Sequence, residues 1–321
     1  MKKYIGTIIT ALVVIALSVL GFVFCPPNLD SVQQETFLIL LIVCGSAAAY
    51  CFVVGELSRN NSQMDKLWSI LPIAYAWIIA GKGNMKPRLV LFAIVVTLWG
   101  IRLTINFARK GAYRLKFWEG EEDYRWQVLR ESKYLKNKAA WAVWDLFFIS
   151  IYQNVLVLAI CLPALAAMTS DAPLGGWDYA AIAAALGFLL LETAADEQQM
   201  DFHTTKKNLL AEGKTLSELP APFNKGFNTV GLWGRARHPN YLGEQGVWLA
   251  LYFVVLGAGV AQNGIFHWTM IGPLFLIFLF LGSSAFGESV SASKYPEYKT
   301  YLAHVSKYVP LWKYKPEKYQ D

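Results

Sequence analysis

Charged residues are scarce in this chain. Asp, Glu, Lys and Arg make up 16% of its 321 residues, whereas hydrophobic residues make up 55% and aromatic residues 15%. A soluble globule of this size needs more charged side chains to cover its surface. The composition therefore excludes an ordinary soluble domain and indicates a chain whose solvent is the lipid bilayer.

Several patterns that define known sites are also absent. The four cysteines, at 25, 44, 51 and 161, have no CxxC spacing, and the four histidines, at 203, 238, 267 and 304, have no HxxxH or HExxH spacing. We therefore predict no protein-bound metal. No GxGxxG follows a strand pattern and no Walker loop occurs, so any nucleotide is held by helices. No array of basic and aromatic residues indicates a nucleic-acid partner.

Apolar stretches are abundant. Eight of them occur, at 4–25, 36–55, 67–81, 88–107, 143–168, 178–195, 244–261 and 265–286. Most are close to the roughly 20 residues that span a hydrocarbon core of about 30 Å. The first is too long for a signal peptide and lacks a small-x-small cleavage site. We predict an all-α polytopic membrane helix bundle of about eight transmembrane helices, with an extra N-terminal helix in 1–30 before the main domain, 31–321.

Lys and Arg predict the orientation. They are concentrated in 102–138, in 203–237 and after 293, whereas 26–35, 169–177 and 262–267 carry none. By the positive-inside rule, both termini and segment 231–244 face the cytoplasm, as expected for an inner-membrane protein. The net charge of +6 fits contact with anionic membrane lipids. The connection 82–88 disagrees, because it places three cations on the predicted outer side.

Two polar connections link these stretches. Segment 108–138 mixes charges of both signs with aromatic residues, which predicts an interfacial amphipathic helix. Segment 197–230 contains Pro220 and Pro222 and several lysines, which predicts a loop or half-helix. No feature of the chain calls for an obligate protein partner.

Two charges lie at or within apolar stretches. Asp65 stands at the entrance to the third stretch and Arg102 lies inside the fourth, where an unpaired charge is costly in lipid. The two side chains can meet across adjacent helices. Such a pair is either structural or an acid that faces a substrate carbonyl.

Two acids lie at the end of the sixth stretch. Glu192 and Asp196 are one helical turn apart and can receive ribose hydroxyls or amide hydrogens. A helix C-terminus disfavours anions, so a compensating group is expected. Lys206 or Lys207 provides one explanation, and a bound ligand provides the other.

Segment 231–244 carries the densest polar chemistry. Arg235 and Arg237 can fork onto phosphate oxygens, and Asn240 and Glu244 share a helix face that begins near Pro239. The result is a helix start that accepts an anion. An interfacial belt of Arg, Trp and Tyr explains the arginines but not Asn240 and Glu244.

Further candidates belong to the same predicted cytoplasmic cofactor pocket. His238 lies inside the segment, and Glu288 follows the eighth apolar stretch closely enough to reach it. The C-terminal tail after Glu288 can close over the same site.

These motifs together resemble the bacterial relatives of the steroid 5-alpha-reductase family. The resemblance rests on Asp65-Lys-Leu-Trp68, Leu98-Trp-Gly-Ile-Arg102, Gly120-Glu-Glu-Asp123-Tyr-Arg-Trp126, Glu192-Thr-Ala-Ala-Asp196, Arg237-His-Pro-Asn-Tyr-Leu-Gly-Glu244 and Tyr295-Pro-Glu-Tyr298. It covers nearly everything after the first apolar stretch. Segment 231–244 is also similar to that of the sterol C14 and C7 reductases.

The resemblance implies an NADPH-dependent oxidoreductase that acts on CH–CH groups, like a 3-oxo-5-alpha-steroid 4-dehydrogenase. It implies that Asn240 and Glu244 lie at the nicotinamide end of NADPH, and Asp196 and Glu192 at its nucleotide portion. Hydride would pass to a polarised double bond of an apolar lipid-like substrate. Asp65 or Tyr241 is the candidate proton donor, with Arg102 nearby.

The chain departs from that family at the substrate end. Trp99 stands where steroid reductases have a Tyr that grips the substrate ketone, and Met64 stands where they have a Gln. An indole donates one hydrogen bond but delivers no proton. We therefore expect Trp99 to contact the substrate of a redox reaction, and this substrate is steroid-like or another lipid-like molecule.

A second resemblance remains open. The isoprenylcysteine carboxyl methyltransferases also carry an Arg-His-Pro-x-Tyr run and use it, with a following Glu, to bind S-adenosylmethionine. That family has no need for Asp65, Arg102 or the motif 120–126, which favours the reductase. A non-catalytic lipid-binding or transport protein is the third alternative.

Overall fold

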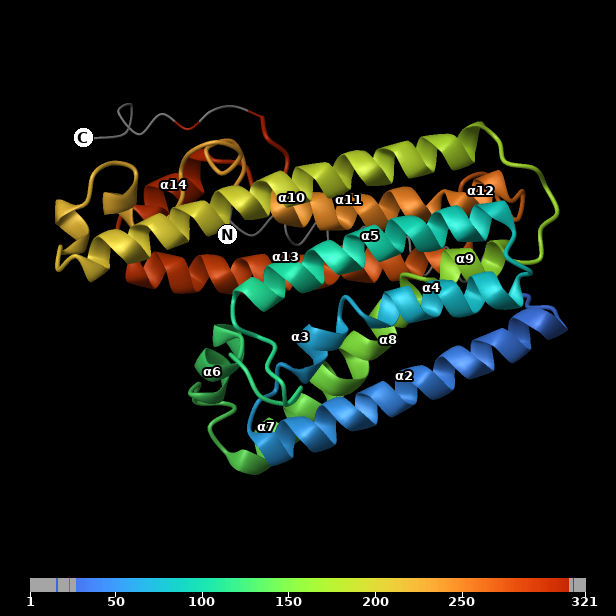
Figure 1. Ribbon diagram of the computed structural model, residues 1–321, viewed down its shortest axis with the longest axis horizontal. Helices are drawn as coiled ribbons and strands as arrows, with labels where there is room; N and C mark the ends of the chain where they lie inside the picture. Colours follow the sequence, from blue (N-terminus) through green and yellow to red (C-terminus); the bar gives the residue numbers. More distant parts are fainter. Residues whose placement is uncertain (1–15, 17–22, 24–26, 312–313, 315–321) are drawn as a thin grey trace. The chain divides into compact units, whose positions relative to one another are not determined.

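A computed structural model describes residues 16, 23, 27–311 and 314, and this part of the chain is helical without strands (Figure 1). The all-α prediction is confirmed. The chain divides into two compact units: unit 1 comprises 1–185 and 248–278, and unit 2 comprises 186–247 and 279–321. The apolar stretch 4–25, and with it the expected N-terminal helix, lies almost entirely outside the described residues.

Five described helices are long and apolar enough to cross a membrane. They are α2 (Ser31–Ser58), α5 (Pro87–Arg109), the continuous helical segment Lys138–Ala167, α10 (Gly176–Ala211), and Trp268–Lys294, which contains α13 (Ile271–Lys294). Each covers a predicted apolar stretch.

The expected total of eight spans is not confirmed, because two stretches form shorter helices. The stretch 67–81 forms α4 (Leu71–Lys82), preceded by the five-residue α3 (Gln63–Leu67), and 244–261 forms α11 (Pro239–Tyr252) followed by α12 (Val254–Gly257). At 1.5 Å per residue, helices of 12 and 14 residues fall short of about 30 Å.

In unit 1, α2 packs against the helices that follow the first polar connection and against α3 and α4. Here Lys138–Ala167 consists of α7 (Lys138–Trp144), the π-helix η1 (Asp145–Tyr152), α8 (Gln153–Ala159) and α9 (Leu162–Ala167). Helices α4 and α5 form a hairpin. The 3-10 helix η4 (Trp268–Met270) precedes α13. The core of unit 1 includes Trp99 and Trp248, whose rings meet edge to face with centroids 4.9 Å apart.

The connection 82–88, which opposed the predicted orientation, is neutralised by acids. Lys82 pairs with Glu35 at 2.6 Å, Lys86 pairs with Asp171 at 2.8 Å, and Arg88 pairs with the buried Asp178 at 2.6 Å. The positive-inside rule counts Lys and Arg and gives acids little weight, so these ion pairs do not remove the disagreement. The orientation stays a prediction.

The expected interfacial helix over 108–138 is corrected to a loop with one short helix, α6 (Tyr124–Arg130), because side chains of the loop bind other segments instead of forming one amphipathic face. The expected loop over 197–230 is also corrected. Helix α10 continues through this region to Ala211 before the 3-10 helices η2 (Leu216–Glu218) and η3 (Phe223–Lys225).

Unit 2 is built on the part of α10 after 185, which runs antiparallel to α11. A Cβ added at Gly243 would lie 2.5 Å from the Cβ of Glu192, and one at Gly246 would lie 2.3 Å from the ring of Phe188. Later residues of α11 therefore contact earlier residues of α10, as in an antiparallel pair. Glycine thus lets the two backbones meet. The second half of α13 and α14 (Tyr298–His304) complete the unit.

Candidate functional site

The loop before α11 is fastened to α10. The amide of Leu232 donates to Gln198 Oε1 at 2.8 Å, and the indole of Trp233 donates to the carbonyl of Ala195 at 2.8 Å. Gly231 sits against the Gln198 side chain with φ +61°, where a Cβ would be 2.3 Å from Gln198 Oε1. Only glycine fits that position, so the backbone of the loop that leads into α11 is fixed against α10.

Arg237 ties this loop to the C-terminal segment. Its Nε donates to Glu288 Oε1 at 2.8 Å, and its Nη1 donates to the carbonyl of Leu302 at 3.0 Å and to that of Val305. Acceptors of the protein therefore occupy Nε and Nη1, and the expected contact of Arg237 with a phosphate stays a prediction. Arg235, in contrast, is exposed.

His238 and Glu288 extend the same cluster. His238 Nε2 lies 3.0 Å from Glu288 Oε1, and its ring stacks on Tyr241 with centroids 5.1 Å apart and an interplanar angle of 14°. Burial lowers the pKa of His238, although the nearby Glu288 carboxylate opposes this effect. The tail does close over segment 231–244: the amides of Arg237 and His238 donate to the carbonyls of Ser306 and Lys307, both at 2.9 Å.

The facing sides of α10 and α11 bring four predicted residues together. Asn240 Nδ2 donates to Asp196 Oδ1 at 3.0 Å, while its Oδ1 is buried without a hydrogen-bond partner among the described residues. Glu192, directly opposite Gly243, and Glu244 are also buried, at 3% and 4% exposure. Buried polar groups need partners. A ligand donor would satisfy the Asn240 oxygen, which makes this face the strongest candidate for a binding site.

Unit 1 contains the remaining predicted residues. Asp65 Oδ2 accepts a hydrogen bond from the Trp126 indole at 2.7 Å, and its Oδ1 lies 3.6 Å from Arg125 Nη2. The ion-pair partner of Asp65 is therefore Arg125, which corrects the expected pairing with Arg102. Arg102 is half-buried on α5.

The protonation of Asp65 reflects its burial. Burial raises the pKa of the Asp65 carboxyl and the Asp123 carboxylate raises it further, while Arg125 and Trp126 act in the opposite direction.

Trp99, the predicted substrate contact, is fully buried against Trp248.

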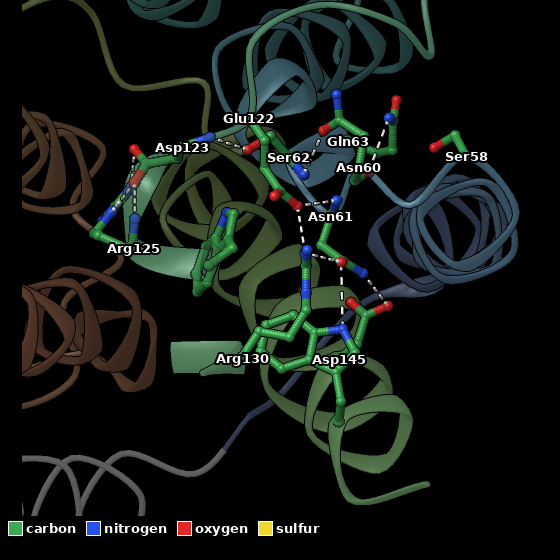
Figure 2. Close-up of polar contacts among 12 residues, drawn as sticks. Ser58, Asn60, Asn61, Ser62, Gln63, Glu122, Asp123, Arg125, Arg130 and Asp145 are labelled. Carbon is green, nitrogen blue, oxygen red and sulfur yellow. Dashed lines mark hydrogen bonds and ion pairs between the residues drawn. The ribbon is translucent and has the colours of Figure 1, made fainter. Parts of the chain in front are cut away.

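The sequence did not predict the polar network that surrounds α3 (Figure 2). Asn61 Nδ2 donates to the buried Asp145 at 2.8 Å, and Asn61 Oδ1 accepts from Arg130 Nη2 at 2.8 Å. Arg130 also donates to Glu122 Oε1 at 2.6 Å. The run of polar residues at 60–63 and the motif 120–126 were visible in the sequence, but their partners lie far away along the chain.

A cavity of about 280 Å³ in unit 1 contains none of the predicted site residues. It is lined by residues that include Asp30, Gln33, His267 and Trp268. Burial lowers the pKa of His267 to about 4, so this imidazole is neutral.

Comparison with known proteins identifies the family. The chain belongs to the family of proteins of unknown function DUF1295, which it matches over residues 51–305 and which is steroid 5-alpha-reductase-like. It is similar to an uncharacterized protein of Schizosaccharomyces pombe, with 34% identity over 266 residues that cover 79% of this chain and 73% of the relative. No solved structure matches the chain.

Proposed function

We propose that this protein is an NADPH-dependent membrane reductase that transfers hydride to a polarised C=C bond of a steroid-like or other lipid-like substrate. The observation that carries the proposal is the contact of Asn240 with Asp196 beside the close crossing of Gly243 and Glu192. Family membership supports it, because the motifs that resemble the steroid reductases lie within the matched residues.

The residues of the α10–α11 face fit this cofactor chemically. The buried Asn240 Oδ1 needs a donor, and a nicotinamide carboxamide or a ribose hydroxyl carries one. Glu192 and Asp196 would accept hydrogen bonds from hydroxyls of the nucleotide portion, and Glu244 would lie with Asn240 at the nicotinamide end. Arg235, which is exposed, and Arg237, whose Nε is bound to Glu288, are the candidate guanidinium groups for a phosphate. When bound, NADPH would supply the hydride.

Reduction of a double bond also needs a proton, and two residues remain candidates for it. Asp65 is an acid whose raised pKa favours the protonated form, which suits a donor. Tyr241 carries a phenol and stacks on His238. Arg102 and Trp99 would contribute to the substrate end of the reaction from α5.

The proposed reaction belongs at a membrane. The five long apolar helices of the described residues are compatible with a membrane protein, and lipid-like substrates would reach such a protein through the bilayer. We place it in the inner membrane with both termini and the α10–α11 polar face towards the cytoplasm, where NADPH is found.

Calorimetry with the full chain in lipid nanodiscs tests the cofactor. We expect saturable binding of NADPH, weakened about 10- to 100-fold by Asn240→Ala, since a hydrogen bond to a charged or buried group contributes about 1.5–3 kcal/mol. Asn208→Ala, which changes an exposed residue of the same type on α10, is the matched control and should leave binding unchanged. Saturable binding of S-adenosylmethionine with none of NADPH would replace the reductase by a methyltransferase.

A further inference from the structure

The loop 111–126 is wrapped around the short helix α3. Lys66 of α3 is completely buried, and its ammonium donates to the carbonyls of Phe117 at 2.6 Å and Glu119 at 2.7 Å. The hydroxyl of Tyr113 donates to the carbonyl of Lys66 at 3.0 Å. Burial lowers the pKa of Lys66 to about 8. These bonds fix the loop to the helix that carries Asp65.

Asp123 fixes the end of the loop. Its amide donates to Ser62 Oγ at 2.8 Å, and its carboxylate caps α6 by accepting from the amide of Arg125 at 2.9 Å. The same carboxylate accepts from Arg125 Nε at 2.8 Å and Nη2 at 3.0 Å (Figure 2). A bidentate pair of this kind holds a guanidinium in one orientation. The charge of Arg125 is therefore set in place by its own cap.

Asp65 lies where these two anchored residues meet. The Trp126 indole, itself 4% exposed, donates to one carboxylate oxygen at 2.7 Å, and Arg125 lies 3.6 Å from the other. An indole N–H can only donate, so Trp126 selects the oxygen that must remain an acceptor. The second oxygen, Oδ1, faces Arg125, and the Ser62 side chain is a further hydrogen-bond partner of this carboxyl group.

We propose that residues 120–126 are a positioning element for the Asp65 carboxyl group, in which Trp126 orients one oxygen and Arg125, held by Asp123, places a fixed positive charge beside the other. This inference deepens the proposed function, because it assigns the motif 120–126 to the candidate acid. Trp126 and Arg125 are positioning residues, since they act through Asp65.

The charges around Asp65 have opposite effects. Burial and Asp123 raise the pKa of Asp65, and Arg125 and Trp126 lower it. Lys66 on the same helix, Tyr113 on the loop and Cys51 on α2 also interact electrostatically with this carboxyl group. Removal of the Arg125 charge should therefore raise the pKa of Asp65, and removal of the Asp123 charge should lower it. Simple loosening of the loop would shift the pKa in the same direction in both variants.

Carbodiimide labelling tests this on the full chain in lipid nanodiscs. Carbodiimides react with protonated carboxyl groups, and the Asp65 side chain is 13% exposed, so a small reagent can reach it. Labelling at Asp65 is mapped by mass spectrometry at a series of pH values, with Asp65→Asn as the site control. The readout is the pH at which labelling falls to half.

We expect Arg125→Gln to raise this midpoint by about one pH unit, because a cation within about 4–6 Å of a carboxyl lowers its pKa by about that much. Trp126→Phe should raise it by less, Arg125→Lys should nearly preserve it, and Asp123→Asn should lower it. Arg114→Gln and Trp118→Phe, which change exposed side chains of the same loop, are matched controls without an expected shift.

Unchanged midpoints in Arg125→Gln and Trp126→Phe, or shifts in the same direction for Arg125→Gln and Asp123→Asn, would overturn the proposal. Arg125→Lys keeps the charge and Trp126→Phe keeps the ring, so the comparison survives if one variant fails to fold. No step of the measurement uses NADPH. A failure of cofactor binding would therefore leave this result intact, and the reverse also holds.

Discussion

The two units hold their polar residues by different means. In unit 2, the polar residues lie on two helices whose backbones come into close contact at Gly243, so their spacing follows from the helical repeat. These residues are Asn240, Glu244, Glu192 and Asp196. In unit 1, Asp65 lies on a five-residue helix and is completed by a loop that begins more than 40 residues later in the chain. One site depends on helix packing and the other on loop closure.

This difference determines how each region tolerates change. Close helix packing fails when volume is added, because well-packed backbones cannot move apart without losing contacts along their whole length. A network of buried charges fails when one partner is removed, because the other is left without compensation. Substitutions of each type therefore distinguish the two units.

The largest effect is expected at a buried ion pair of unit 1. Arg88 donates to both carboxylate oxygens of Asp178 and to three backbone carbonyls, with both side chains at most 5% exposed. Arg88→Met leaves Asp178 uncompensated and should cost about 3–5 kcal/mol of unfolding free energy, measured by denaturation in lipid.

A matched variant separates burial from charge. Lys86→Met removes a cation whose partner, Asp171, is 92% exposed, and it should leave the unfolding midpoint unchanged. The double variant Arg88→Met with Asp178→Leu should recover most of the lost stability, because neither charge remains. Equal losses for Arg88→Met and Lys86→Met would contradict the role given to burial.

The next effect is expected at the helix crossing of unit 2. Gly243→Ala adds a Cβ that would lie 2.5–2.8 Å from Glu192, including its backbone atoms, and should cost about 1–3 kcal/mol. It should also weaken NADPH binding, because Asn240 and Asp196 sit one turn from the crossing. Thermal midpoints and calorimetry measure the two effects.

Gly282→Ala is the control within the same unit. Nothing lies within 4 Å of a Cβ at Gly282, so this variant should gain up to about 1 kcal/mol from helix propensity and bind NADPH normally. If Gly243→Ala were as stable as Gly282→Ala, α10 and α11 could not be in the close contact described for unit 2.

The contrast between the units also explains what the sequence could predict. Five long apolar stretches gave helices at the expected places, and α11 begins at Pro239, because hydropathy and helix-start preferences are local properties. The polar positions on α10 and α11 were found for the same reason. Their contact across Gly243 needed the structure, since the sequence does not show which helices pack together.

Loop contacts were harder to predict. The pairing of Asp65 with Arg125 and Trp126 has no periodicity, and Arg102 was the more obvious partner because it lies within an apolar stretch. The partners of Arg237 were not predicted for a related reason: Glu288, Leu302 and Val305 lie more than 50 residues further along the chain. Long-range partners are set by tertiary packing.

The smallest effect is a pH dependence that belongs to unit 2. The pKa of His238 is lowered from its ordinary value of 6.5, chiefly by burial, so the folded state binds fewer protons than the unfolded state just below that pH. The stability due to neutral His238 is complete above about pH 6.5 and is lost as the pH falls towards the folded-state pKa, by at most about 1.4 kcal/mol per pH unit for one proton.

Thermal midpoints of wild type and His238→Gln, compared from about pH 7 down to about pH 5, test this dependence. Gln can still donate a hydrogen bond to Glu288 but does not titrate, so the difference between the two proteins should shrink as the pH falls. His203→Gln, at an exposed position on α10, should retain the wild-type slope. A constant difference between wild type and His238→Gln would show that His238 keeps its ordinary titration, and that burial in unit 2 does not set its charge as burial in unit 1 sets that of Asp65.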